Sequence, residues 1–137
     1  MKISNVMNSK IESISPSAST KEAARKMHDM HIGALLVQEN DQLLGIITDR
    51  DICCKVTATG RHAVITKVHE VMNKDVATCY IDQELAEAAE IMSLLHVRRL
   101  AVVNRDNTLA GFLSVDDIAH YSHDLASNIL VSANMMH

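Results

Sequence analysis

The hydrophobic and polar positions along the first half of the chain predict four elements in a row. Apolar residues recur at helical spacing from Ala23 to Met30, after a serine-x-x-glutamate start signal at Ser19. Two short apolar runs follow at 32–37 and 43–47, and the polar turn between them predicts a β-hairpin. Asp49 then stands where a second helix is expected to begin. The predicted order is helix, strand, strand, helix.

The second half repeats these features in the same order about 65 residues later. EAARKM corresponds to EAAEIM, HIGALLV corresponds to HVRRLAV, and GIITDRDI corresponds to GFLSVDDI. The repeat predicts helices over 84–95 and from 115 or 116, and strands over 100–103 and 109–113. It indicates an α/β (α+β) fold of two pseudo-symmetric motifs, each a small sheet with two helices packed on it.

The boundaries expected from the repeat are 1–60 for the first motif and 61–120 for the second. A helical tail is expected over 121–137, with Leu125, Ile129 and Leu130 as its buried stripe. A motif of about 60 residues buries little apolar surface alone, so we expect the two motifs to share a core.

Composition and charge narrow the classes of function. The net charge is −4, aromatic residues make up 2%, and no basic block occurs, which argues against nucleic-acid binding. No apolar run reaches a membrane span and the first ten residues lack a signal peptide, so we expect a cytoplasmic protein without membrane contact. Three cysteines are an odd number and form no disulfide framework, so buried reduced thiols are expected.

The repeated motif keeps three polar or special positions inside an apolar frame: a glycine (Gly45, Gly111), a hydroxyl (Thr48, Ser114) and an aspartate (Asp51, Asp117). A hydroxyl followed by an acid three residues later is a common helix cap. The same carboxylate suits the two hydroxyls of a ribose, and backbone amides at a helix start suit a phosphate. Capping and ligand binding are compatible, and local chemistry leaves both open.

The chain resembles a tandem pair of CBS domains, also called a Bateman module. The matching segments are SISPSASTKEAARKM, HIGALLV and LLGIITDRDI in the first copy, and ATCYIDQELAEAAEIM, HVRRLAVV and LAGFLSVDDI in the second. It is also similar to stand-alone bacterial CBS-pair proteins. The resemblance implies a regulatory module that binds an adenosine-containing ligand, such as AMP, ADP, ATP or S-adenosylmethionine, between the two motifs. The nucleotide is expected as a regulatory ligand, and no cofactor is expected to be required.

Carried over residue by residue, the resemblance implies that Asp51 and Asp117 hold ribose, with Thr48 and Ser114 on ribose or phosphate. The adenine is expected against the segment before the first helix of each motif and the start of its hairpin: Ser13, Ile14, Pro16, Ile32, Gly33 and Ala34, and Thr78, Cys79, Val97, Arg98 and Arg99.

The two copies differ in charge at this site. Arg98 and Arg99 replace a glycine and an alanine, and they are either a solvated strand edge or an anchor for a phosphate. Arg50 is a second phosphate candidate, whereas the matching Asp116 would repel a phosphate. We therefore expect the two sites to be unequal.

Two further hypotheses remain beside the nucleotide sensor. The chain has eight histidines, and Cys53, Cys54, His62 and His69 lie close in sequence, but none of these residues has a strong zinc spacing. The other hypothesis is a purely structural CBS protein that dimerises without a nucleotide. No catalytic motif occurs, so we expect no enzyme, and we expect a homodimer with an unidentified protein partner.

Overall fold

The chain forms two compact units, described here from a computed structural model. The structure describes the backbone of residues 1–134 and the side chains of residues 1–131, so the last three residues of the expected tail lie outside the described residues. The first unit is Glu12–Val76, and the second unit combines Met1–Ile11 with the chain from Ala77 onward. These limits differ from 1–60 and 61–120 because the segment that precedes each repeat packs with the other repeat.

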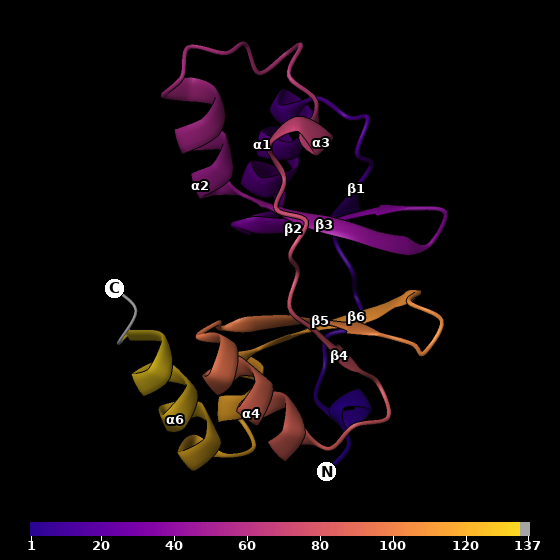
Figure 1. Cartoon of the computed structure of the whole chain (residues 1–137), viewed down its shortest axis with the longest axis vertical. Helices are drawn as coiled ribbons and strands as arrows, with labels where there is room; N and C mark the ends of the chain where they lie inside the picture. The colour runs from indigo at the N-terminus through magenta and orange to yellow at the C-terminus, as the bar shows by residue number, and fades with distance from the viewer. Residues whose placement is uncertain (135–137) are drawn as a thin grey trace. The chain divides into compact units, whose positions relative to one another are not determined.

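The first unit is a three-stranded sheet with helices on one side of it (Figure 1). Its elements in chain order are β1 (Ser13–Ile14), α1 (Thr20–Met30), β2 (Ala34–Glu39), β3 (Gln42–Thr48), α2 (Asp49–Ile52), the π-helix η2 (Cys53–Thr57) and α3 (Val68–Val71). Strand β2 is central, parallel to β1 and antiparallel to β3. Asn40 and Asp41 close the hairpin with positive φ angles of 53° and 64°, which suits a tight two-residue turn.

The second unit repeats this architecture and adds one helix. Its elements are the 3₁₀ turn η1 (Ile3–Asn5), β4 (Thr78–Tyr80), α4 (Leu85–Leu95), β5 (Arg99–Val103), β6 (Leu109–Ser114), α5 (Val115–Ala119) and α6 (His123–Asn134). The sheet order is β4-β5-β6, with the same parallel and antiparallel pairs. The α+β fold class is therefore confirmed. The short strands β1 and β4 were not expected from the sequence.

The repeated glycines lie where a second segment of chain approaches a strand closely. In the first unit, Ile46 and Asn73 exchange backbone hydrogen bonds of 2.9 and 2.8 Å. A Cβ on Gly45 would stand 2.6 Å from the Asn73 carbonyl oxygen. The close approach of a second backbone is therefore the structural reason for a glycine at this position.

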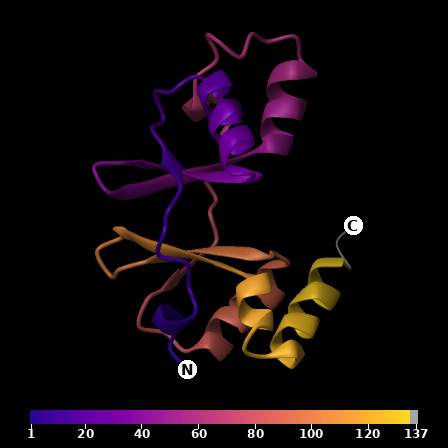
Figure 2. The ribbon, with the colours of Figure 1, turned by 180° about the vertical axis from the view of Figure 1, so that it is seen from behind.

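The N-terminal segment makes the equivalent contact in the second unit (Figure 2). Asn8 and Phe112 exchange backbone hydrogen bonds of 2.8 and 2.9 Å, and Ile3 donates its N–H to the Gln83 carbonyl at 3.0 Å. A Cβ on Gly111 would stand 2.9 Å from the Asn8 carbonyl oxygen. Residues 1–11 are thus a structural part of a unit whose remaining residues begin at position 77.

Each unit has its own hydrophobic cluster, where a single shared core was expected. The first cluster contains Ala23, Met27, Leu35, Val37, Ile47, Val56, Val68 and Val71. The second contains Ile3, Val6, Cys79, Leu85, Ala88, Ala89, Met92, Leu100, Val102, Leu113, Val115, Ile118, Ala126 and Ile129. The parallel third strand and the docked flanking segments supply the additional buried surface that four elements alone would lack.

The tail helix α6 packs within the second unit, on α4 and α5 (Figure 2). Ile129 is fully buried and Leu125 and Leu130 pack against the same cluster, as the expected stripe requires.

Among the cysteines, Cys79 is buried but Cys53 and Cys54 are exposed, so the expectation of burial is wrong for that pair. Cys53 and Cys54 are exposed because, in the helical turn Cys53–Thr57, it is the side chain of Val56 that points into the core.

Candidate functional site

The first strand-end site consists of Gly33, Ala34, Thr48, Arg50 and Asp51. It lies where the hairpin ends and α2 begins, because Ala34 pairs with Thr48 in the β2–β3 ladder. The Asp49 N–H donates to the Gly33 carbonyl at 2.9 Å, and this bond places the start of the helix beside the start of β2. Thr48, rather than Asp49, is the N-cap of α2.

Thr48 and Asp51 form a reciprocal capping box. The Asp51 carboxylate oxygen Oδ2 accepts from the Thr48 N–H at 2.9 Å and from the Thr48 hydroxyl at 3.0 Å, while the Asp51 N–H and Thr48 Oγ1 lie 3.1 Å apart. The other carboxylate oxygen, Oδ1, lies 3.1 Å from the Lys55 ammonium. Lys55 also donates to the Val71 carbonyl at 3.1 Å. Both oxygens of Asp51 are therefore engaged within the first unit.

The second strand-end site consists of Arg98, Arg99, Ser114 and Asp117. Arg99 pairs with Ser114 in the β5–β6 ladder, and the Val115 N–H donates to the Arg98 carbonyl at 3.0 Å. The Ser114 N–H donates to Asp117 Oδ2 at 2.9 Å, and the Asp117 N–H donates to the Ser114 hydroxyl at 3.2 Å. The backbone geometry therefore matches that of the first site.

The two sites differ in the charges around the aspartate. Position 121, four residues after Asp117, holds a tyrosine where the first site has Lys55. Within the part of the chain that the structure describes, no hydrogen bond or ion pair occupies Asp117 Oδ1, and none engages the side chain of Arg98 or Arg99. Both arginines are exposed. The second site thus offers one unused acceptor oxygen and two unpaired cations.

The residues before the first helix of each motif lie one strand away from these sites. Ser13 pairs with Leu36 across β1–β2, where its hydroxyl accepts from Gln38 at 2.7 Å and its carbonyl from Lys26 at 2.6 Å. Thr78 pairs with Ala101 in the same way and is exposed. Both residues therefore lie on the strand beside the hairpin of their unit, and Ser13 already has protein partners there.

Several residues expected to line an adenine belong partly to the cores. Ile14, Ile32 and Val97 are half-buried and pack against the clusters, and Pro16 is buried. The Cys79 side chain is 2% exposed within the second cluster, where burial raises the pKa of its thiol to about 12. A neutral, core-facing thiol has no ligand chemistry to offer in this conformation.

A metal centre has no preformed counterpart in the described residues. No group of three or more histidine, cysteine, aspartate or glutamate side chains converges among them. No helix in the described part is both long and apolar enough to cross a bilayer.

Comparison with known sequences agrees with the repeated architecture. A sequence model of the CBS domain matches residues 3–56 and again residues 68–124. The chain belongs to the CBS domain family. It is 33% identical over 117 residues to the CBS domain-containing protein YhcV of Bacillus subtilis (strain 168), an alignment that covers 85% of this chain and 82% of that protein.

Solved structures of other CBS proteins share the fold. The CBS domain protein TA0289 of Thermoplasma acidophilum, described as of unknown function, superposes with a TM-score of 0.83 at 21% identity, covering 98% of this chain and 76% of that one. PAE2072 of Pyrobaculum aerophilum, solved in complex with AMP, gives a TM-score of 0.79 at 19% identity, covering 96% and 99%. The recognition of a CBS pair from the sequence is confirmed.

Sequence reasoning found the capping pairs but missed Lys55 beside Asp51 and the two segments that dock on the sheets. Lys55 stands four residues after Asp51, a spacing that places the two side chains on one helix face and was available in the sequence. The docked segments around Asn8 and Asn73 were visible only as a repeated Val-Met-Asn sequence, with nothing local to show what they contact.

Proposed function

We propose that this CBS pair is a regulatory module that binds an adenosine-containing nucleotide, with the second strand-end site as its stronger ribose site. The observation that carries the proposal is the unused oxygen of Asp117 beside the unpaired Arg98 and Arg99. CBS pairs are regulatory modules, and this chain keeps the strand-end hydroxyl and aspartate of both motifs. The AMP complex of a protein with the same fold supplies the probe.

The chemistry of the second site suits a nucleoside monophosphate. A carboxylate with one oxygen fixed by the Ser114 N–H can present its other oxygen to the vicinal hydroxyls of a ribose. An arginine presents a planar fork of donors to a phosphate. The resemblance assigns Ser114 to ribose or phosphate and Thr78 to the adenine side, and we retain both assignments as part of the proposal.

The first strand-end site is proposed to be the weaker of the two. A ribose that uses Asp51 must displace the Lys55 ammonium from Oδ1 or share that oxygen with it. Arg50 is exposed and remains a candidate for phosphate contact there, while Gly33 and Ala34 leave the strand start without a side-chain cation. The expectation of unequal sites is therefore supported by a specific ion pair.

Signalling requires a ligand that binds two forms of the protein unequally, because equal affinity shifts no equilibrium. We propose that occupancy changes a surface read by an unidentified protein partner in the cytoplasm, and that the chain itself catalyses no reaction. Self-association as a homodimer is part of the same proposal.

Calorimetric titration with AMP tests this function. Asp117→Asn keeps an oxygen that can accept from the Ser114 N–H, so it removes charge while leaving the cap in place. We expect this substitution to weaken AMP binding by at least tenfold and Asp51→Asn to weaken it less. Two identical binding events per chain, or equal effects of the two substitutions, would contradict the unequal sites. No binding of AMP, ADP, ATP or S-adenosylmethionine would favour the purely structural alternative.

A further inference from the structure

The Lys55 ammonium joins the first strand-end site to α3. Its Nζ lies 3.1 Å from Asp51 Oδ1 and donates a hydrogen bond to the Val71 carbonyl, also at 3.1 Å. Asp51 belongs to α2, whereas Val71 is the last residue of α3. Lys55 follows Asp51 by about one helical turn, so a single side chain from η2 contacts both elements.

The Val71 carbonyl lies at the end of a helix, where acceptors need partners from outside the helix. The last four carbonyls of a helix have no intrahelical donor, and a lysine side chain nearby can supply one. Val71 is only 3% exposed and belongs to the hydrophobic cluster of the first unit, so water has little access to this end of α3. Removing the ammonium would leave a poorly solvated acceptor, and α3 would be held less firmly at its C-terminal end.

The segment that begins with α3 docks on the first sheet and then leaves the first unit. The Val68 N–H donates to the Ala18 carbonyl at 2.9 Å, which holds the start of α3. Asn73, just beyond α3, exchanges backbone hydrogen bonds with Ile46. The first unit ends a few residues later. The Lys55 contact therefore lies on the stretch of chain that connects the strand-end site with the exit from its unit.

We propose that Lys55 transmits occupancy of the first strand-end site to α3. A ribose bound by Asp51 brings hydroxyl donors to Oδ1, the oxygen that the Lys55 ammonium contacts. The ligand and the ammonium compete for this acceptor, so ligand binding displaces Lys55 from the position in which it also holds the Val71 carbonyl. Such coupling is reciprocal, because whatever weakens the Lys55 contacts must favour the ligand to the same extent. The inference rests on the proposed function, which supplies the ligand.

The second unit lacks the residue that makes this connection. Tyr121 stands at the position that corresponds to Lys55, and Val6 corresponds to Val71. Tyrosine brings no ammonium to Asp117, so a ligand in the second site has no lysine to displace at this position. Occupancy of the first site alone is therefore expected to loosen the segment docked on its sheet.

Lys55→Met tests the connection, because methionine keeps an unbranched side chain and removes the charge. The first site is observed in the full-length chain carrying Asp117→Asn, in which the second site is weakened. Calorimetry should show that Lys55→Met raises the affinity of this chain for AMP about fivefold, near the upper limit for an ion pair whose lysine is half-exposed.

Hydrogen exchange measures the other half of the coupling. Without nucleotide, Lys55→Met should speed exchange of the amides of residues 68–73 about fivefold and leave those of 77–131 unchanged. Saturating AMP should speed exchange of the same amides in the Asp117→Asn chain that keeps Lys55. It should add nothing once position 55 is methionine, because the ligand then has no ammonium to displace.

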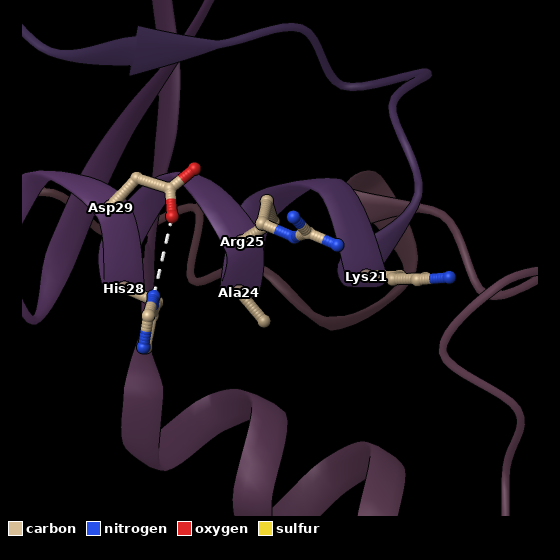
Figure 3. A pocket seen from close by; sticks show the side chains of 5 residues that line it. All are labelled: Lys21, Ala24, Arg25, His28 and Asp29. Carbon is tan, nitrogen blue, oxygen red and sulfur yellow. Dashed lines mark hydrogen bonds and ion pairs between the residues drawn. The ribbon is translucent and has the colours of Figure 1, made fainter.

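Lys21→Met is the matched control. Lys21 extends from the outer face of α1 and lines a hollow of about 410 Å³ that includes no residue of the strand-end site (Figure 3). Within the described part of the chain, no ion pair or hydrogen bond engages its side chain. The same substitution at position 21 should therefore change neither the affinity for AMP nor exchange over 68–73. Circular dichroism of each variant confirms that it is folded.

The outcomes separate the coupling from nucleotide binding itself. If AMP binds but exchange over 68–73 is unchanged in Lys55→Met, the coupling is overturned and the proposed function stands. Equal effects of Lys55→Met and Lys21→Met have the same meaning, since charge alone would explain both. An Asp117→Asn chain that binds no AMP with either residue at position 55 also overturns the coupling. Absence of AMP binding to the wild-type chain overturns the proposed function, and the coupling with it.

Discussion

Replacing Ile3 with alanine is expected to destabilise residues 77–131, although these lie more than seventy positions away in sequence. Ile3 is 0% exposed and belongs to the hydrophobic cluster of the second unit. Its N–H also donates to Gln83 at 3.0 Å, but this backbone bond survives the substitution. The effect therefore measures side-chain packing of the N-terminal segment.

The magnitude follows from the loss of a fully buried aliphatic side chain. Truncating isoleucine or leucine to alanine in a core costs about 2–5 kcal/mol, the larger values arising where the cavity cannot collapse. We expect about 3 kcal/mol, because the segment is held by backbone bonds at Ile3 and Asn8 and cannot easily close the gap. This corresponds to a roughly hundredfold increase in the population of the opened second unit.

Hydrogen exchange followed by mass spectrometry is the appropriate assay because it resolves segments. Amides of α4, β5 and β6 should exchange faster, while those of the first unit, 12–76, should change little. Ile65→Ala is the matched control: Ile65 is 71% exposed, so the same truncation should cost under about 0.5 kcal/mol. Faster exchange confined to 12–76, or none anywhere, would refute the assignment of residues 1–11 to the second unit.

Three further predictions concern single groups. Gly45→Ala should lower the free energy of unfolding by about 1–3 kcal/mol, because the new Cβ would stand 2.6 Å from the backbone oxygen of Asn73. Urea denaturation measures this change, and an unchanged midpoint would contradict the close approach. Cys79 should resist thiol reagents that modify the two exposed cysteines. Its raised pKa also means that stability falls as pH rises above about 9, where the unfolded thiol ionises and the buried one does not, and Cys79→Ala should flatten that alkaline slope. The pKa of the Glu84 carboxylate is lowered by the N-terminal ammonium and then by Lys2, so the ionised carboxylate should favour docking of the N-terminal segment above about pH 4.5. This stabilisation should be lost as the pH falls through the lower pKa of the folded state. Hydrogen exchange of residues 1–11 would detect the loss, and Glu84→Gln should abolish the pH dependence.

The strongly periodic parts of the fold were predictable from the sequence. The helix now seen as Leu85–Leu95 was expected at 84–95, and the hairpin strands were expected within two residues of their ends, because long amphipathic runs and polar turns are local signals. β1 and β4 were not found, since two or three residues carry no periodicity. The strand expected at Ile32 begins at Ala34 because His31, with φ 56°, and the bond from Ile32 to Met27 extend the helix cap.

The candidate site was predictable in its backbone but not in its charges. The spacing of Thr48 and Asp51 indicated the cap that the structure contains. Whether both oxygens of an aspartate are occupied depends on the neighbouring side chains. The spacing of Asp51 and Lys55 in the sequence allowed an ion pair, and the structure shows that the pair is formed. Cys79 was expected to line a ligand because of its place in the motif, yet strand alternation turns it into the core.

The non-contiguous second unit has a consequence for synthesis on the ribosome. The first unit is a single stretch of roughly 65 residues, so all of its partners are available once Val76 has been made. Residues 1–11 emerge before it yet find their own partners only after the chain beyond Ala77 has been made. Because synthesis proceeds at about 5–20 residues per second, the apolar side chains of Ile3 and Val6 remain exposed to solvent for several seconds. Residues 1–11 are therefore a segment to which a chaperone would have a long opportunity to bind.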